Sequence, residues 1–337
     1  MAELSNRVVL GSWPTPVEPA PRLAAAIGLG PEDLFVKRDD LTGLGAGGNK
    51  VRKLEWTVGA AIAGGATALV TSGAAQSNHA RLTAAAAARL GLEAVLVLAG
   101  RPAADAGGNI TLQGLLGARL VWAGDVDGAT LERTVRDVAH HLDAHGRTAA
   151  VIPFGGTDVR ATRGYVLAGR ELMEQVPDVE HVVTAVGSGG TMAGLVGALG
   201  RRRVLGVDCG AVPDAAETVD GLLTAMPEKA DGTELRLRGD QVGTGYGALQ
   251  PAVLEAITLC ARTEGIVLDP VYTGRALAGL VAAVREGDIR PGRRTVLLHS
   301  GGLPGLFGHP EAVREASTRV VEASLCADGD GQAGTGS

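Results

Sequence analysis

The sequence has 337 residues, which is enough for one large domain or for two modest domains that share a cleft. Its net charge of -6 and its isoelectric point near 5.7 argue against nucleic acid or an anionic membrane as its main partner. Hydrophobic residues make up 45% of the chain and aromatic residues only 3%, so the predicted core consists mainly of Ala, Val and Leu.

Short apolar segments alternate with longer amphipathic or Ala-rich segments along most of the chain. Apolar runs predict buried strands, and segments with helical periodicity predict helices. In chain order we expect a strand at 67–71, a helix at 77–90, a strand at 93–98, a helix at 109–117, a short strand from 121, a helix at 128–145, a strand at 149–154, a helix at 163–174, a strand at 181–186, a helix at 191–199, and strands at 204–209 and 295–299. This alternation predicts an α/β fold whose parallel sheets are flanked by helices.

The alternating units between residues 54 and 152 form a complete run, which indicates a small α/β domain inserted into a larger one. We therefore predict a large domain made of residues 1–53 and 153–325, a small domain of residues 54–152, and an active site between the two lobes. In open sheets of this kind, ligands bind beyond the carboxyl ends of the strands.

The first candidate motif is the glycine-rich segment 45–53, GAGGNKVRK. Glycines let the backbone approach a ligand closely, and a lysine at the end of such a loop can reach into a pocket. A nucleotide phosphate loop needs Gly-Lys-Ser/Thr, but here Asn49 precedes the lysine and Val51 follows it. A solvated turn that enters a helix is the alternative, so the importance of Lys50 and Lys53 depends on the neighbouring motifs.

The second motif, TSGAAQSNH at residues 71–79, follows a predicted strand and opens a predicted helix. Free N–H groups and the dipole at a helix start attract anions such as a substrate carboxylate. Ser77, Asn78 and His79 add side-chain donors there. Simple N-capping of the helix by Ser77 is the alternative.

The third motif, VGSGGT at residues 186–191, also lies between a strand and a helix, and is typical of a backbone nest for a phosphate. A dinucleotide fingerprint would need a glycine at the sixth position from Gly187, where this chain has Met192. The motif therefore favours a compact phosphate over a pyrophosphate. An ordinary glycine-rich turn is the alternative.

Two of the three tyrosines, Tyr246 and Tyr272, lie in glycine-flanked loops at residues 243–246 and 270–275. A tyrosine hydroxyl can move a proton or donate to a carboxylate, although a half-buried structural aromatic would look the same. A further glycine turn, HSGG at residues 299–302, follows the last predicted strand.

The cysteines Cys209, Cys260 and Cys326 lie far apart and form neither a metal-ligand spacing nor a disulfide framework. The N-terminus has no basic-then-apolar signal segment, and no apolar run approaches the length of about 18 residues that a membrane span requires. We therefore expect a cytoplasmic protein without a metal site. Residues 326–337 are rich in Gly and Asp and predict a disordered tail.

Taken as an ordered set, the segments KRDDLTGL…GGNKVRK, SGAAQSNHAR…AARLGL, GSGGT, LDPVYTGRAL and HSGGLPGLFG resemble the D-cysteine desulfhydrase and 1-aminocyclopropane-1-carboxylate (ACC) deaminase family. The similarity extends from about Leu10 to Gly308. The resemblance implies a pyridoxal 5'-phosphate (PLP) enzyme with the two-lobed tryptophan-synthase-β-like fold, fold type II, whose larger lobe binds the cofactor. It also implies a homodimer, the commonest symmetric assembly.

The resemblance further implies that Lys50 forms a Schiff base with PLP and then serves as the acid and base of the reaction. Asn78 would bond the ring hydroxyl, Thr273 would meet the pyridine nitrogen, and Lys53 would help a glycine turn to hold the phosphate. The residues implied to bind the cofactor are Lys50, Lys53, Asn78, Gly187, Ser188, Gly189, Gly190, Thr191, Thr273 and Ser300.

For the substrate, the resemblance implies that Ser77, the adjacent backbone at Asn78 and the side chain of His79 bind the carboxylate, while Tyr246 and Tyr272 face the reacting group. The implied reaction is α,β-elimination on a small amino acid, D-cysteine or a β-substituted alanine. The products would be pyruvate, ammonia and the leaving group. An alternative from another class is a nucleotide- or metabolite-binding protein without PLP chemistry.

Four residues bear on the choice within the family. The deaminase branch carries Glu where this chain has Thr273 and Leu where it has Ser300, which favours the desulfhydrase branch over ACC deaminase. Relatives carry small residues where this chain has Arg160 and Arg163. If either arginine lined the pocket, an acidic substrate such as cysteate, and hence a sulfo-lyase activity, would become the alternative.

Overall fold

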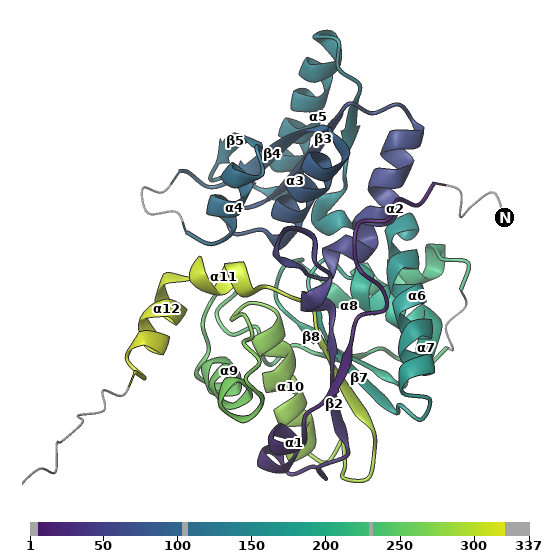
Figure 1. Ribbon diagram of the computed structural model, residues 1–337, viewed down its shortest axis with the longest axis vertical. Helices are drawn as coiled ribbons and strands as arrows, with labels where there is room; N and C mark the ends of the chain where they lie inside the picture. Colours follow the sequence, from purple (N-terminus) through teal and green to yellow (C-terminus); the bar gives the residue numbers. More distant parts are fainter. Residues whose placement is uncertain (1–5, 103–106, 229–231, 321–337) are drawn as a thin grey trace, which may run out of the picture.

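The computed structural model describes residues 6–102, 107–228 and 232–320, which are arranged around two β-sheets (Figure 1). Figure 1 shows the smaller sheet in the upper part of the molecule and the larger sheet in the lower part. The predicted tail at residues 326–337 lies outside the described residues, as does Cys326. In the described part of the chain, every helix is too short or too polar to cross a membrane.

The smaller sheet has four strands, all parallel, in the order β5 (Arg119–Gly124), β4 (Glu93–Ala99), β3 (Ala68–Ala74) and β6 (Ala149–Val151). Alternate side chains of a strand point to opposite faces of its sheet. Leu96 and Leu98 of β4 therefore pack in the core shared with the Ala-rich α3 (Asn78–Leu90). Val95 and Val97 pack against α5 (Gly128–Ala144) on the other face, and α4 (Asn109–Leu115) packs beside α3.

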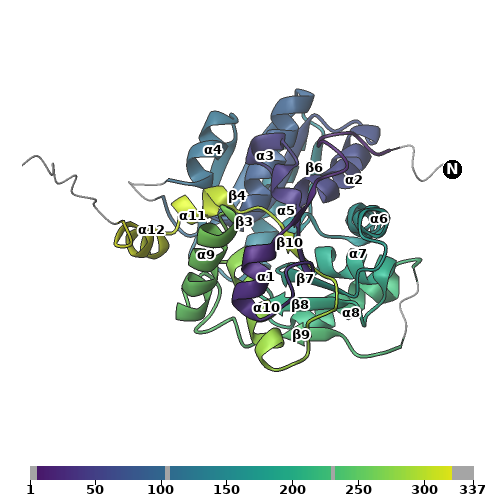
Figure 2. The same ribbon diagram turned by 60° about the horizontal axis from the view of Figure 1, so that its bottom comes forward.

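The larger sheet has six strands in the order β1 (Val17–Pro19), β2 (Leu34–Arg38), β10 (Thr295–His299), β7 (His181–Val186), β8 (Val204–Asp208) and β9 (Arg236–Arg238). Only the edge strand β1 is antiparallel to its neighbour. One face is covered by α1 (Pro21–Ile27), α9 (Pro251–Glu264) and α10 (Thr273–Arg285), and the other by α6 (Val159–Gln175), α7 (Gly190–Leu199) and α8 (Ala215–Ala225) (Figure 2).

The helix α2 (Lys50–Ala63) packs against both α3 and α6, and so contacts helices of both sheets. The predicted domain boundary between residues 53 and 54 falls inside this helix, and the position of that boundary stays a prediction. Short helical turns complete the chain: η2 (Asp39–Leu41), η3 (Leu44–Ala46), η4 (Phe154–Gly156), α11 (Leu303–Phe307) and α12 (Pro310–Ser317).

The predicted strands at 181–186 and 295–299 match β7 and β10 residue for residue. The predicted strand at 149–154 is too long, because Pro153 and the turn η4 follow β6. The helix predicted to begin at residue 163 begins at Val159. Asp158 caps that helix by accepting a hydrogen bond from the backbone N–H of Ala161 at 2.7 Å.

A buried charge network holds α2 against α6. Arg52 is 4% exposed and donates to Asp39 Oδ2 and to Glu171 Oε2, each at 2.9 Å. The Tyr165 hydroxyl also donates to Asp39, at 2.6 Å. The guanidinium of Arg52 holds the pKa of Asp39 below its ordinary value, despite the burial that opposes it. Because Lys50 stands one turn or less from Arg52 on α2, this network also fixes the start of that helix.

Replacing Arg52 with Met is expected to lower the free energy of unfolding by about 3–5 kcal/mol, because the variant leaves the buried carboxylate of Asp39 without its cation. Urea unfolding followed by tryptophan fluorescence measures this change. The control is Arg293→Met, whose exposed pair with Glu180 contributes only about 0–1 kcal/mol. Equal losses in the two variants would contradict the role given to the network.

Candidate functional site

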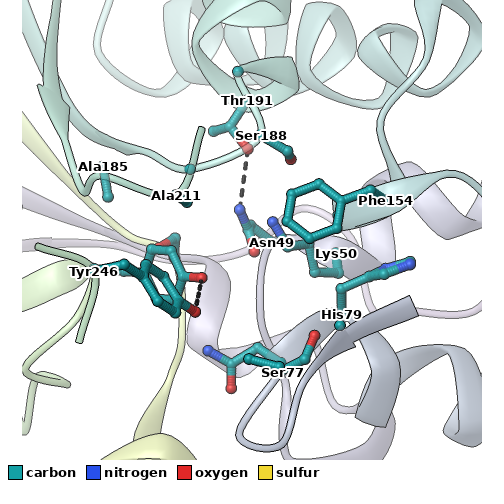
Figure 3. Close-up of a pocket in the computed structure, with 18 of the residues that line it drawn as sticks. Asn49, Lys50, Ser77, His79, Phe154, Ala185, Ser188, Thr191, Ala211 and Tyr246 are labelled. Atoms are coloured by element: carbon teal, nitrogen blue, oxygen red, sulfur yellow. Dashed lines mark hydrogen bonds between the residues drawn. The ribbon is translucent and has the colours of Figure 1, made fainter. Parts of the chain in front are cut away.

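A cavity of about 260 Å³ lies where the carboxyl ends of strands from both sheets meet (Figure 3). Its wall includes residues at or just beyond the ends of β3, β4, β7, β8 and β10. The volume is near the lower end of the roughly 300–1,000 Å³ typical of small-molecule sites, so the cavity suits a compact ligand. The predicted site residues on its wall are Lys50, Ser77, Asn78, His79, Gly187, Ser188, Gly189, Thr191, Tyr246, Tyr272 and Ser300.

Lys50 is the first residue of α2, and Figure 3 shows its side chain among the residues that line the cavity. The preceding loop needs glycine, because a Cβ on Gly47 would lie 1.7 Å from the carbonyl oxygen of Asp40. Burial lowers the pKa of Lys50 to about 8. A substantial fraction of this amine is therefore neutral, and hence nucleophilic, near physiological pH.

The turn between β7 and α7 provides an anion site beside Lys50. Gly189 has a positive φ of 77°, and the first N–H groups of α7 have no partner within the helix. The side chain of Asn49 donates to Thr191 Oγ1 at 3.0 Å, which ties this turn to the residue that precedes Lys50. The structure thus brings the first and third motifs of the sequence into one wall.

Lys53 lies behind this wall and does not line the cavity. It is fully buried and donates to the carbonyl oxygen of Gly155 at 2.8 Å and to Thr157 Oγ1 at 2.7 Å. Thr157 in turn shares a 2.7 Å hydrogen bond with Ser188 of the glycine turn. A direct phosphate contact by Lys53 stays a prediction, and the contact observed here runs through Thr157. Gly190 also lies off the wall.

The start of α3 forms a second anion site across the cavity from α7. Ser77 caps the helix by accepting from the backbone N–H of Ala80 at 3.1 Å. A Cβ on Gly73 would lie 2.6 Å from Ser77 Oγ, so glycine at that position lets the cap come close. The N–H groups of Asn78 and His79, in the first turn, have no partner within the helix.

The side chain of His79 does not suit the carboxylate-binding role that the sequence implied. Burial lowers the pKa of His79 well below its ordinary value, so the ring is neutral. Its Nε2 lies 2.8 Å from Thr71 Oγ1, and that hydroxyl donates to the carbonyl oxygen of Ile152. Nε2 must therefore carry the hydrogen, and Nδ1 is left as a buried acceptor without a partner among the described residues. An acceptor cannot bind a carboxylate, which leaves only the backbone of His79 for that role.

The two tyrosines of the sequence motifs meet on the cavity wall. Their hydroxyls are 2.8 Å apart, and Figure 3 shows this hydrogen bond on the side of the cavity away from His79. Burial raises the pKa of Tyr272 well above its ordinary value. Tyr272 therefore keeps its proton throughout the physiological range and is available as a donor.

Of Thr273 and Ser300, only Ser300 lines the cavity. Thr273 is buried at the start of α10, where its hydroxyl donates to Asp269 Oδ1 at 2.7 Å. In this structure the Thr273 hydroxyl is therefore turned away from the cavity wall, and its predicted contact with the pyridine nitrogen stays a prediction. Ser300 follows β10, and its hydroxyl is the candidate for that contact on the cavity wall.

The wall fits PLP in its chemistry. A buried amine stands beside an anion site at a helix start, and Asn78 and Ser300 provide a side-chain amide and a hydroxyl. Small residues, glycine and alanine, line the cavity at the ends of β3, β7 and β8 and leave room for a ring. The amine matches the aldehyde of PLP, and the anion site matches its phosphate. The polar side chains and the small residues match its polar aromatic ring.

Several wall residues were not predicted from the sequence, including Asn49, Leu131, Phe154, Gly210 and Ala211. Asn49 could have been suggested by its place next to Lys50. Gly210 and Ala211 follow β8, which neighbours β7, so their position at the carboxyl edge of the sheet was the available signal. Leu131 carries no sequence signal, because it reaches the cavity only through the packing of α5.

A profile described as "Pyridoxal-phosphate dependent enzyme" matches residues 8–301. A Pyrococcus abyssi protein named "Putative 1-aminocyclopropane-1-carboxylate deaminase" is 37% identical over 324 residues, which cover 92% of this chain and 95% of that protein. A Pyrococcus horikoshii protein of the same name is 38% identical over 312 residues, covering 89% and 93%. A solved structure described as "Crystal Structure Analysis of the ACC deaminase homologue" matches with a TM-score of 0.85 at 36% identity, covering 93% of this chain and 98% of that chain.

These similarities extend over nearly the whole chain. They confirm the predicted α/β fold of type II and the predicted cofactor, pyridoxal 5'-phosphate. The chain therefore belongs to the pyridoxal-phosphate-dependent enzymes, within the family of the D-cysteine desulfhydrases and ACC deaminases.

Proposed function

We propose that the enzyme catalyses α,β-elimination on a small, uncharged amino acid, with D-cysteine or a β-substituted alanine as substrate and pyruvate, ammonia and the leaving group as products. The observation that carries this proposal is that one cavity contains both a group suited to take a proton and a group suited to donate one. Lys50 readily loses its proton, because burial lowers its pKa to about 8. Tyr272 firmly keeps its own, because burial raises its pKa.

Six of the wall residues have a proposed task in such a reaction. When bound, the cofactor withdraws electrons from the substrate's α-carbon. Lys50 would hold the cofactor in the resting enzyme, and once the substrate's amino group has replaced it there, the released amine would take the proton from that carbon. The N–H groups of Asn78 and His79, with the Ser77 hydroxyl, bind and orient the carboxylate. Tyr272, supported by Tyr246, donates a proton to the departing group.

The charge of the wall supports an uncharged substrate side chain. Among the wall residues, only Lys50 and His79 can carry a positive charge, and none carries a carboxylate. Arg160 is exposed, and Arg163 stacks 5.7 Å from the centre of the Trp56 ring, so neither lines the cavity. Lys50 is assigned to the cofactor and the His79 ring is neutral, so no side-chain cation is left on the wall to pair with a sulfonate, which counts against cysteate as the substrate.

Ring opening of ACC is the second candidate, and the names of the Pyrococcus relatives favour it. Ser300 on the wall and Thr273 behind it favour elimination, because the deaminase branch carries Leu and Glu at these positions. Assays of the holoenzyme with D-cysteine, L-cysteine, β-chloroalanine and ACC distinguish the two reactions. Pyruvate release is expected to exceed 2-oxobutyrate release by about tenfold or more in kcat/KM. The reverse ranking would replace our proposal with the deaminase activity.

The lowered pKa of Lys50 predicts how the apoprotein takes up PLP with pH. The neutral amine reacts with the aldehyde, so the uptake rate should rise with pH and reach half of its maximum near pH 8. Stopped-flow absorbance of the apoprotein mixed with PLP measures this rate, and free lysine serves as the control. A midpoint near 10.5, the ordinary value for lysine, would show that Lys50 is not buried as described.

A further inference from the structure

We propose that Asn109 is a positioning residue that fixes the orientation of the Asn78 side-chain amide, so that its Nδ2 donor faces the ring hydroxyl oxygen of the cofactor. The inference rests on the proposed contact between Asn78 and that oxygen, and it is independent of which substrate the enzyme uses. Asn109 does not line the cavity. It therefore acts through Asn78.

Asn109 is the first residue of α4 and is fully buried. Its Nδ2 donates twice, to the backbone carbonyl oxygen of Gln76 at 2.8 Å and to Asn78 Oδ1 at 3.0 Å. Its own backbone N–H donates to Gln76 Oε1 at 2.8 Å, while Gln76 Nε2 donates to the carbonyl oxygen of Gly107 at 3.0 Å. The segment before α4 and the segment before α3 are thus joined directly behind the cavity wall.

The contact with the backbone of Gln76 decides which way both amides point. A carbonyl oxygen can only accept, so the Asn109 atom that faces it must be the NH₂ group. The same NH₂ group faces Asn78, so Asn78 must present its oxygen there. The NH₂ group of Asn78 is then left for the cavity, and it has no hydrogen bond to a described residue.

This orientation matters because the ring oxygen of the cofactor carries negative charge when it is ionised. A donor aimed at that oxygen favours its ionised form, and an acceptor aimed at it favours the protonated form. The reversed Asn78 amide would present an acceptor. Without a neighbour that selects one orientation, the Asn78 amide could form hydrogen bonds in either of its two orientations.

The surroundings of Asn109 show that packing alone does not require an amide there. Its Oδ1 is buried without a partner among the described residues, which disfavours folding. The pair is also enclosed, since a Cβ on Gly305 of α11 would lie 3.7 Å from Asn109 Nδ2 and 3.9 Å from Asn78 Oδ1. Figures 1 and 2 both show α11 beside α4 at this point. An apolar side chain of similar size would fill the same space without the unpaired carbonyl.

The test compares the absorbance spectra and PLP dissociation constants of purified holoenzyme variants in the absence of substrate. Asn109→Leu removes the donor, and Asn109→Asp replaces it with an acceptor that attracts the NH₂ group of Asn78 away from the cavity. Both are expected to shift the cofactor band toward that of the protonated ring oxygen. Both should also weaken PLP binding by about 10- to 100-fold, as expected for a lost hydrogen bond to a charged group. The shift should be larger for Asp than for Leu.

Gln113→Leu is the matched control. Gln113 is a fully buried amide one turn further along α4, and it contacts the Ala75 carbonyl oxygen at 3.5 Å but not Asn78. It should keep the spectrum and PLP affinity of the wild type. Asn109→Ala, with a smaller side chain that also lacks a donor, gives the same comparison if Asn109→Leu does not fold.

Two results would overturn the inference, and they differ from each other. Wild-type spectra and affinities in the Asn109 variants, together with altered ones in Asn78→Leu, would reduce Asn109 to a structural residue. Unchanged values in Asn78→Leu itself would remove the proposed contact between Asn78 and the cofactor. Neither result depends on the substrate assays, so a wrong substrate assignment leaves this test intact.

Discussion

Replacing Lys50 with Ala is expected to abolish the visible absorbance band of the holoenzyme and to lower turnover by at least about 10²–10⁴-fold, the range for loss of a positioned acid or base. The physical reason is that this one amine both attaches the cofactor and takes the substrate proton. Its burial at the start of α2 lowers its pKa to about 8. Absorbance after incubation with PLP, and keto-acid release, measure the two effects.

The chain offers a sharp control for that experiment, because it contains only four lysines: Lys37, Lys50, Lys53 and Lys229. Borohydride reduction of the wild-type holoenzyme followed by peptide mass mapping should place the cofactor on Lys50 alone. Lys53→Met should retain the band with weaker PLP binding, since Lys53 contacts the glycine turn only through Thr157. A reduced adduct on another lysine, or full activity in Lys50→Ala, would refute the assignment.

The second large effect is expected for Tyr272→Phe, which should lower kcat by about 10²–10⁴-fold through loss of a proton donor. The absorbance spectrum and PLP affinity should stay close to those of the wild type, because the ring remains in place. The raised pKa of Tyr272 also means that the donor stays protonated at high pH. The activity should therefore not fall between pH 8 and pH 9 through this group.

Tyr246→Phe is the matched comparison, since the two hydroxyls share one hydrogen bond. Tyr246 is 43% exposed, so water can replace its hydroxyl as the partner of Tyr272, and we expect a loss of about tenfold or less. Steady-state kinetics with the best substrate of the panel measure both variants. Equal losses would assign the proton donation to the pair, and an unchanged kcat in Tyr272→Phe would exclude that residue as the donor.

Local sequence patterns were sufficient for much of the fold. The apolar runs that became β7 and β10 are bounded by polar or glycine residues, so their limits could be predicted to the residue. The strand β2 was missed, because its sequence LFVKR ends in two charged residues. Lys37 lies buried there with its counter-charge supplied by Glu171, which is far along the chain.

The candidate site was predictable as a set of turns, because glycine-rich segments after strands and a lysine after a glycine loop are local features. Their mutual positions were not predictable in the same way. Asn49 and Thr191 are 142 positions apart and still share a hydrogen bond. The sequence placed Lys53 and Thr273 in the site, while the fold turned both hydrogen-bonding groups toward neighbours behind the wall.

Local sequence was enough to predict most strands, the glycine turns and the chemical types available at the strand ends, because propensity, periodicity and capping depend on neighbouring residues. Only the tertiary structure decided which of these groups share a cavity and in what state of charge. His79 shows the difference: as a residue near a helix start it could be a cation or a donor. Packing between Thr71 and Gly156 removes it from water and makes it a neutral acceptor. Burial and hydrogen-bond partners decide the pKa of a side chain, and both depend on segments that are distant in sequence.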